Sequence, residues 1–396
     1  HLDRKFWDDT AWGYGSLAVV ASSGIAINFV VAAQMGSEAL GVFNQIYAVY
    51  VIAAQVAVMA VHDSAQKHTA EHAEDSDACA VLSAAALAHS AVTGSVIALA
   101  VYLASGLVGD VLGSPSTAMG LALAAPGLAL FSINKVLLGI LNGHRKMRFY
   151  AVGQGIRAVG IFAVCLLVAL YDQPAYLLGL SFTLTEVALL PFLLMVAAPR
   201  RIDWRFQGEL KRWVGLHFSF GSRAFVNGLL AEAYIRVDII MLGIFLSDAQ
   251  VGIYSFAAMF IEGLFQISVV VRTIANPALV KLLSPLDKAG LRRFVHRISG
   301  LSLLMTALVA GVLAGAFPYL ALFFDEMLVS GGYRVLVILA AGMTVFSIFV
   351  PVDHVMLQAG RPGVQSAMMT GNILVNVALN LALIPAYGLI GAASAT

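Results

Sequence analysis

The sequence predicts an all-α integral membrane protein built from two pseudo-symmetric bundles of six helices. Hydrophobic residues make up 60% of its 396 positions and charged residues only 11%, whereas soluble domains have about 45–50% and about 25%. The mean hydropathy is +0.88. Apolar stretches long enough for a helix to cross a hydrocarbon core of about 30 Å alternate with short loops. These spans must be helices, because lipid offers backbone groups no other partner and no barrel-like alternation is present.

The apolar stretches divide the chain into eleven spans and the beginning of a twelfth. We predict spans at 14–35, 39–61, 78–105, 117–141, 149–171, 175–198, 213–246, 251–275, 297–323, 331–357 and 364–385, with the twelfth starting at 387. His62 and Asp63 end the second span, and Asp353 and His354 interrupt the tenth. Residues 62–77 read as a solvated loop that is acidic and rich in histidine. The chain stops soon after Tyr387, so we expect it to end inside a membrane helix.

Basic residues gather in the loops on one side of the predicted spans. The loops after the fourth, sixth and eighth spans hold Arg145, Lys146 and Arg148; Arg200, Arg201, Arg205, Lys211 and Arg212; and Lys281, Lys288, Arg292, Arg293 and Arg297. The opposite loops are mostly acidic. Short basic loops stay in the cytoplasm, so we predict a multi-pass protein of the inner or plasma membrane with a cytoplasmic N-terminus.

Two unrelated motifs recur at the same distance along the chain. Gly41-Val42-Phe43 is matched by Gly252-Ile253-Tyr254, 211 positions later (252 − 41). Pro174-Ala175-Tyr176 is matched by Pro385-Ala386-Tyr387 at the same offset (385 − 174). Six spans in each half make both halves enter the membrane in the same sense, as parallel repeats of transporters do. We therefore predict two domains, 1–212 and 213–396, with a substrate held between them.

Two segments carry a resemblance to a known family. The first is Arg236-Val237-Asp238-Ile239-Ile240-Met241-Leu242-Gly243, followed by Val251-Gly252-Ile253-Tyr254 and Asn276-Pro277. The second is Ile384-Pro385-Ala386-Tyr387-Gly388-Leu389-Ile390-Gly391-Ala392-Ala393-Ser394-Ala395-Thr396. Both resemble polysaccharide-export flippases of the multidrug/oligosaccharidyl-lipid/polysaccharide exporter superfamily. The resemblance implies two six-helix bundles facing a central cavity, alternating access, and a polyprenyl-phosphate-linked glycan as cargo. It also implies contacts with membrane lipids and a monomer.

Five basic residues remain inside the predicted spans: Lys135, Arg157, Arg223, Arg236 and Arg272. A charge at bilayer depth costs a few kcal/mol or more, so each is a candidate functional residue. Arginine binds phosphate oxygens in pairs, and a cationic vestibule would attract the headgroup of a lipid-linked sugar. Among the five, Arg223, at the start of the second half, is the residue that we most expect to bind the headgroup. Lys135 and Arg272 lie close enough to the interface to reach water without any ligand.

The acidic residues inside the spans are candidates for coupling to an H⁺ or Na⁺ gradient. They include Glu186, Glu262, Glu232 and Asp238. Glu232 lies four residues before Arg236, so a simple ion pair along one helix is the favoured interpretation there. Glu186 and Glu262 have no opposite charge within a helical turn, which makes titration during transport plausible.

Other functions and sites fit the sequence less well. A drug or organic-cation antiporter of the multidrug and toxin extrusion type is the main alternative, although its cavity should be acidic. Short outer loops argue against a glycosyl polymerase or ligase, and charges inside the spans argue against a passive scaffold. His68 and His72 lack a third ligand, so we expect no metal site. We also expect no enzymatic activity, no cofactor, no nucleic-acid partner and no disulfide between Cys79 and Cys165.

Overall fold

The computed structural model is helical in the part of the chain that it describes, which is residues 4–197, 207–283, 288–358 and 361–396. Within these ranges there is no strand, and nine helices are long and apolar enough to cross a membrane. The predicted all-α membrane fold is therefore confirmed.

The chain divides into two compact units. The first unit consists of His1–Met35 and Val42–Arg236, and the second of Gly36–Gly41 and Val237–Thr396. The change from one to the other falls inside a long helix, α7 (Gln207–Phe245). The predicted domains, 1–212 and 213–396, stay a prediction.

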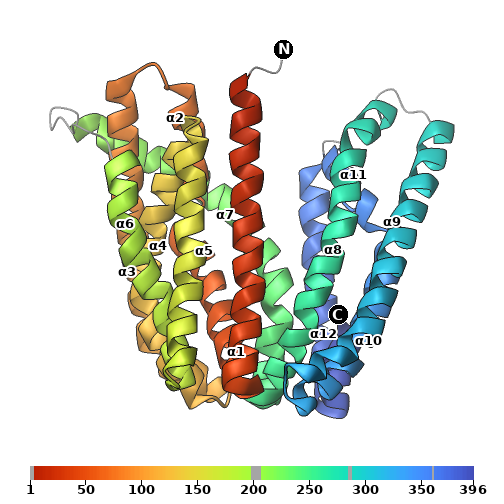
Figure 1. Ribbon diagram of the computed structural model, residues 1–396. Helices are drawn as coiled ribbons and strands as arrows, with labels where there is room; N and C mark the ends of the chain where they lie inside the picture. The colour runs from red at the N-terminus through yellow and green to blue at the C-terminus, as the bar shows by residue number, and fades with distance from the viewer. Residues whose placement is uncertain (1–3, 198–206, 284–287, 359–360) are drawn as a thin grey trace. The chain divides into compact units, whose positions relative to one another are not determined.

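Helix α4 forms the centre of the first unit (Figure 1). The helices of this unit are α1 (Arg4–Val58), α2 (Val61–Glu71), α3 (Ser76–Val111), α4 (Pro115–Gly143), α5 (Met147–Leu170), η1 (Ala175–Gly179), α6 (Leu180–Ala197) and the first part of α7. Helix α4 lies against α2, α3, α5 and α6. Its Leu137, Leu138 and Leu141 pack with Leu189 and Leu193 of α6 into a fully buried cluster. Apolar packing therefore holds α4 and α6 in position, and these helices carry polar residues of the candidate site.

Helix α1 contains both of the first two predicted spans. It is interrupted at Gly36, whose φ of 83° and ψ of −178° are not helical. In Figure 1 the chain reverses its direction here, between the red and the orange-red segments. Glycine adopts a positive φ without the steric cost that a Cβ atom brings. The two predicted spans thus meet at one glycine.

The prediction of a solvated loop at residues 62–77 is wrong. Most of this segment is the helix α2, which starts after Met59 and Ala60 at positive φ. The small side chains of Ser64, Ala65 and Thr69 are buried, and the helix packs on α3 and α4. Small buried residues between charged ones gave only a weak apolar pattern, which is why the sequence read as a loop.

Helix α7 is the exception among the long helices that were predicted to span the membrane. It covers the predicted span 213–246 but is not among the nine helices that are apolar enough. Arg223, Glu232, Arg236 and Asp238 all lie along it and lower its hydropathy. Of the predicted basic loop before it, Arg200, Arg201 and Arg205 lie outside the described residues.

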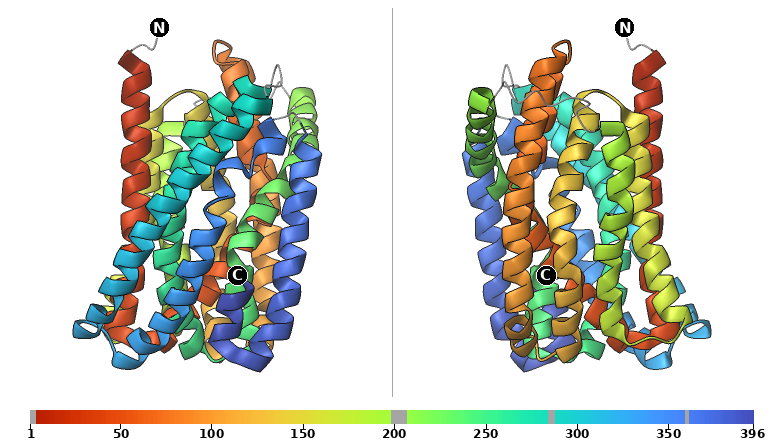
Figure 2. Two further views of the ribbon diagram at one scale, coloured as in Figure 1. Left: turned by 90° about the vertical axis from the view of Figure 1, so that its right-hand side faces the viewer. Right: turned by 90° about the vertical axis from the view of Figure 1, so that its left-hand side faces the viewer.

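The second unit packs around α8. Its elements are the end of α7, α8 (Asp248–Leu283), α9 (Lys288–Ala316), η3 (Phe317–Leu322), α10 (Glu326–Phe346), η4 (Val350–Val352), α11 (Val355–Gln358) and α12 (Pro362–Ala395). Leu264 of α8 joins Ala310, Ala340, Met343 and Val350 in a buried cluster. The left view of Figure 2 shows α8, α9 and α10, coloured from teal to blue.

Two predicted spans of the second unit differ in their ends. The tenth span was predicted to reach residue 357. Its helix, α10, ends at Phe346, and the chain continues through the short elements η4 and α11. Pro351 lacks the N–H group that a continuing helix requires. In α12 the backbone breaks at Gly388, with a φ of 58°, and Figure 2 shows the last residues turning back toward the C-terminus. The break lies where the sequence predicted the start of the twelfth span.

The repeated motif of the sequence recurs as a contact between backbones in the second unit. A Cβ atom on Gly41 would lie 1.8 Å from the carbonyl oxygen of Asp248, and one on Gly252 would lie 1.8 Å from that of Ser37. Ser37 and Asp248 are 211 positions apart (248 − 37), as are Gly41 and Gly252. The contact is therefore reciprocal, and no residue larger than glycine fits on either side of it.

Candidate functional site

An ion pair between two helices lies inside the first unit. Arg157 of α5 donates hydrogen bonds from Nε and Nη2 to the two carboxylate oxygens of Glu186 on α6, at 2.5 and 3.0 Å. Only 12% of the Arg157 side chain and 3% of the Glu186 side chain are exposed. A bidentate pair removed from solvent in this way is strong and specific in geometry.

Asn134 of α4 completes this arrangement. Its Nδ2 donates to Glu186 Oε2 at 2.7 Å and to the Glu186 carbonyl oxygen at 3.0 Å. The guanidinium of Arg157 also lies 4.6 Å from the centre of the Phe131 ring. We call Asn134, Arg157 and Glu186 the first-unit triad. The triad joins three helices. A change in its charge would therefore alter the contacts among α4, α5 and α6 together.

Two polar residues lie beside the triad. The hydroxyl of Tyr50 is buried without a hydrogen bond among the described residues, and its ring stacks on Phe182 at 4.6 Å. Lys135 follows Asn134 on α4, is partly buried, and has no ion pair within the described ranges. A buried donor without a partner costs about 1–3 kcal/mol, so the Tyr50 hydroxyl marks a place where a polar group is retained at a cost.

A second ion pair lies in the second unit. Arg272 of α8 donates from Nη1 to Asp353 Oδ2 at 2.6 Å and lies 3.4 Å from Nε2 of His354. The exposed fractions of the two side chains are 16% and 28%. Asp353 directly follows the 3₁₀ turn η4, so its backbone is not part of a regular helix. Whether Arg272 reaches the interface without a ligand or binds a substrate stays a prediction.

Asp238 of α7 is held by neutral partners. Asn380 of α12 donates to its Oδ1 at 2.8 Å, and the hydroxyl of Thr396 donates to its Oδ2 at 2.9 Å. Tyr254 lies 3.0 Å from the same threonine hydroxyl. Hydrogen bonds from neutral donors stabilise a carboxylate without cancelling its charge.

The other candidates from the sequence belong to none of the ion pairs and hydrogen-bonded groups described above. Arg223 is exposed and donates from Nε to the Ser219 carbonyl oxygen at 2.9 Å. The guanidinium of Arg236 lies 4.8 Å from the centre of the Tyr47 ring. Glu232 is partly buried and Glu262 is exposed. The roles of these four residues, and the predicted pairing of Glu232 with Arg236, stay predictions.

Sequence analysis missed the neutral members of these groups. Asn134, Asn380 and Thr396 each donate to a buried carboxylate, yet none carries a charge that draws attention. A signal was present, because asparagine is rare in apolar spans and finds a polar partner there. An asparagine in a span therefore points to a polar partner, which is a carboxylate for Asn134 and Asn380 and another asparagine for Asn44.

Apolar helices of spanning length and buried polar groups between them define a multi-pass helical membrane protein. Residues 74–330, more than half of the chain, match the profile of the family described as polysaccharide biosynthesis protein. The chain belongs to this family. The resemblance found in the sequence is thereby confirmed.

One curated relative is the probable low-salt glycan biosynthesis flippase Agl15 of Haloferax volcanii. It is 24% identical over 180 residues, which is 45% of this chain and 38% of the relative. The matched part therefore spans well under half of that protein.

Solved structures of transporters share the fold. A lipid II flippase, MurJ, in an inward closed conformation has a TM-score of 0.71 at 14% identity, covering 98% of this chain and 84% of its own. An inward-facing multidrug resistance transporter of the MATE family, in the MOP superfamily, has a TM-score of 0.70 at 12% identity, covering 96% and 93%. A MOP superfamily transporter from Pyrococcus furiosus has a TM-score of 0.58 at 13% identity, covering 96% and 88%. At these identities the likeness establishes the fold alone.

Proposed function

We propose that this protein is a flippase that moves a lipid-linked oligosaccharide or polysaccharide precursor from the cytoplasmic to the outer leaflet by alternating access. Its family and a relative described as a probable glycan flippase support this function. So does the fold that it shares with a lipid II flippase. The cargo is a glycan on a polyprenyl phosphate, and the protein works as a monomer in the inner or plasma membrane. The basic loops support a cytoplasmic N-terminus.

The observation that carries a mechanism is the first-unit triad. Arg157 is a permanent cation within the membrane, and Glu186 holds both edges of its guanidinium. A phosphate group is a bidentate partner of the same shape as a carboxylate. Arrival of the headgroup phosphate would therefore compete with Glu186 for Arg157, and departure would restore the pair. In this mechanism Glu186 keeps the site neutral whenever no cargo is bound, since an uncompensated charge at this depth is costly.

Coupling to an ion gradient follows from the same exchange. When Arg157 turns to a phosphate, Glu186 loses its counter-charge and becomes the group that takes up a proton or Na⁺. Asn134 remains hydrogen-bonded to it and holds its position. Glu186 is therefore the first of the coupling candidates, ahead of Glu262, Glu232 and Asp238.

A drug or organic-cation antiporter is the second candidate function. The MATE family structure fits as well as the flippase does, with TM-scores of 0.70 and 0.71. The carboxylate of Asp238, held only by neutral donors, would suit a cationic cargo. The family match favours the glycan, because the family is described by polysaccharide biosynthesis.

Complementation of a strain that lacks its own glycan flippase tests the proposal. The full-length protein should restore surface glycan, and Arg157→Ala should abolish this at an equal amount of protein in the membrane. Arg334→Ala is the matched control, because Arg334 is exposed on α10 in the other unit. Restored resistance to cationic dyes with no surface glycan would overturn the flippase in favour of the antiporter. Normal glycan export by Arg157→Ala would remove the triad from the mechanism.

A further inference from the structure

Three helices of the first unit end in the same hydrogen-bonded turn, but with different residues at its critical position. At the ends of α3, α4 and α5 this position is Gly113, Arg145 and Asp172, with φ of 60°, 55° and 50°. In each turn the next N–H group donates to a carbonyl oxygen five residues earlier. The three bonds are Ser114 to Gly109 at 2.9 Å, Lys146 to Leu141 at 2.8 Å and Gln173 to Val168 at 3.0 Å. This is the Schellman motif, whose left-handed position favours glycine.

Arginine at this position is a departure that needs a reason. Helix α3 shows that the turn forms with glycine, which avoids the clash of a Cβ atom at positive φ. Residues held in sparsely populated backbone regions cluster at functional sites, so an observed outlier is a reason to look for one. The side chain of Arg145 is the feature that glycine could not supply.

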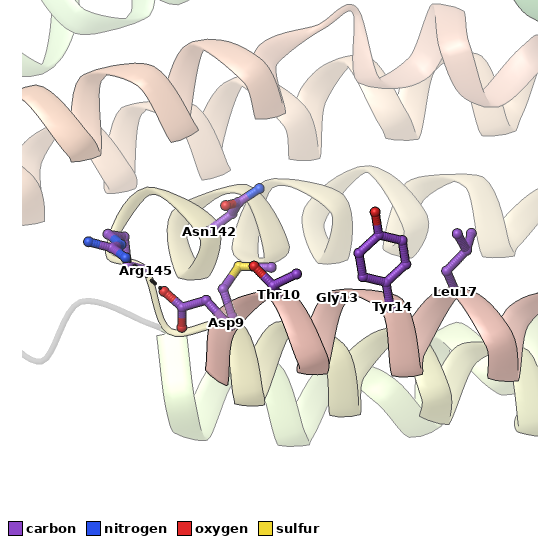
Figure 3. A pocket seen from close by; sticks show the side chains of 8 residues that line it. Asp9, Thr10, Gly13, Tyr14, Leu17, Asn142 and Arg145 are labelled. Carbon is purple, nitrogen blue, oxygen red and sulfur yellow. Dashed lines mark hydrogen bonds and ion pairs between the residues drawn. The ribbon is translucent and has the colours of Figure 1, made fainter. Parts of the chain in front are cut away.

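The side chain of Arg145 points to the start of α1. Its Nη2 lies 3.1 Å from Oδ2 of Asp9 (Figure 3), and 53% of the arginine side chain is still exposed. Only part of its hydrogen-bonding capacity is used by Asp9, because a guanidinium has five N–H donors.

Two hollows meet at this ion pair and differ in character. The larger, of about 470 Å³, runs along α1 past Gly13, Tyr14 and Leu17. Tyr14 and Leu17 are 71% and 62% exposed, which gives the hollow an apolar wall. The smaller hollow, of about 260 Å³, is lined by charged residues. Arg145, Asp9 and Met147 line both hollows, so the two adjoin each other.

Positive charge predominates in the smaller hollow. Its bases are Lys5, Arg145, Lys146 and Arg148, and its acids are Asp8 and Asp9. Arg148 also stacks over the ring of Trp12 at 5.6 Å. Aromatic rings with nearby bases are typical of the level of lipid headgroups. The apolar stretch of α1 starts at Trp7, which places this charged hollow at the end of a membrane span.

We propose that the two hollows form one site for an anionic membrane phospholipid. Its phosphate occupies the charged hollow beside Arg145 and Lys146, and the upper part of an acyl chain lies along Tyr14 and Leu17. Free phosphate would use the charged hollow only and would leave the apolar one without a role. This site is separate from the triad, so it stands whether or not the protein is a flippase.

Binding of phospholipid to the purified full-length protein tests this site. The protein in neutral detergent is mixed with phosphatidylglycerol or phosphatidylcholine, and bound lipid is counted by native mass spectrometry. The unchanged protein should retain phosphatidylglycerol in preference to phosphatidylcholine. Arg145→Gly should lower this retention about fivefold, from the loss of one base near the surface. Because glycine suits the backbone at this position, the variant should fold at least as well as the parent.

The chain offers two matched controls. Asp172→Gly makes the same backbone change at the end of α5, where the side chain is exposed, and should leave lipid retention unchanged. Asp9→Asn removes a negative charge and should retain phosphatidylglycerol as well as the parent or better. If Arg145→Gly and Asp9→Asn weaken folding and retention alike, the pair is only a structural bridge and the proposal fails. Equal binding of both lipids, or full displacement by inorganic phosphate, would also overturn it.

Discussion

The two buried arginine pairs of this protein are built differently, although each joins an arginine to an acid of another element. In the first unit Glu186 lies on a regular helix, is 3% exposed, and accepts from both Arg157 and Asn134. In the second unit Asp353 follows a 3₁₀ turn, is 28% exposed, and has one carboxylate oxygen without a hydrogen bond among the described residues. The first pair is more deeply buried and both of its carboxylate oxygens accept hydrogen bonds, whereas the Asp353 side chain of the second pair is more exposed to water, although its unbonded oxygen is itself buried.

The difference teaches which pair can act as a switch. Removing one partner of a desolvated pair lowers the free energy of unfolding most, because the remaining charge has neither water nor an ion-pair partner. A partly exposed pair loses less, because water replaces the missing partner. We therefore assign the exchange with a phosphate to Arg157 and a structural role to Arg272, where the pair holds the irregular segment after α10 to α8.

Removing Arg157 should have the largest effect on stability. Arg157→Ala leaves Glu186 buried without its ion-pair partner, so we expect the free energy of unfolding to fall by about 3–5 kcal/mol. Denaturation of the purified protein in a mild detergent measures this. The double variant Arg157→Ala/Glu186→Gln removes both charges and should recover most of the loss. If the double variant is as unstable as the single one, packing by the arginine stem and not charge holds α5 to α6.

Removing Arg272 should have a smaller effect. Asp353 can be hydrated once its partner is gone, so Arg272→Ala should lower the free energy of unfolding by about 1 kcal/mol. The same denaturation experiment compares the two single variants directly. Equal losses at Arg157 and Arg272 would show that exposure does not distinguish the two pairs.

Asn134 sharpens the comparison, because only the first pair has such a third partner. Asn134→Ala removes the donor to Glu186 Oε2 and leaves a buried carboxylate oxygen with one bond fewer, which we expect to cost about 1–3 kcal/mol. Asn142→Ala, at the end of the same helix, serves as a control for loss of an asparagine side chain. A variant of Asn134 as stable as that control would remove it from the triad.

An effect that appears only at acidic pH concerns His62, at the start of α2. Burial, together with the charge of Lys135, lowers the pKa of His62 from its ordinary value of 6.5 to about 3. Between these values the unfolded chain binds a proton that the folded protein does not, so this residue makes stability fall as the pH drops through that window. His62→Gln should unfold at a temperature that depends less on pH between about 7 and about 4. An unchanged slope would show that other groups set the acid sensitivity.

Much of the fold follows from local properties of the sequence. Hydropathy located both ends of α4 and α5 to within about two residues, and the start of α3 equally closely, although α3 extends six residues beyond the predicted end at 105. The 211-residue repeat singled out Gly41 and Gly252 without predicting that they meet, as they do in the structure. Hydropathy depends on residues that are neighbours in the sequence, and the repeat depends on recurring motifs. Both can be read from a single sequence.

The site was less predictable, because its contacts join distant positions. Arg157 and Glu186 were both identified as candidates, yet they are 29 positions apart and on different helices, so no spacing rule connects them. The sequence also did not predict the left-handed conformation of Arg145, because arginine is not a typical turn residue. Glycine is one, and Gly113 occupies the equivalent position at the end of α3. Helix α2 was missed because small residues fill its buried face.

Transport by the double variant Arg157→Ala/Glu186→Gln tests the central claim most directly. The neutral pair should fold, insert and unfold at nearly the temperature of the parent, so a loss of transport cannot be attributed to a damaged structure. In liposomes that contain a lipid-linked oligosaccharide, we predict that the parent exposes the glycan on the opposite leaflet and that the double variant does not. A double variant that transports as fast as the parent would contradict the account and leave the triad as an element of structure only.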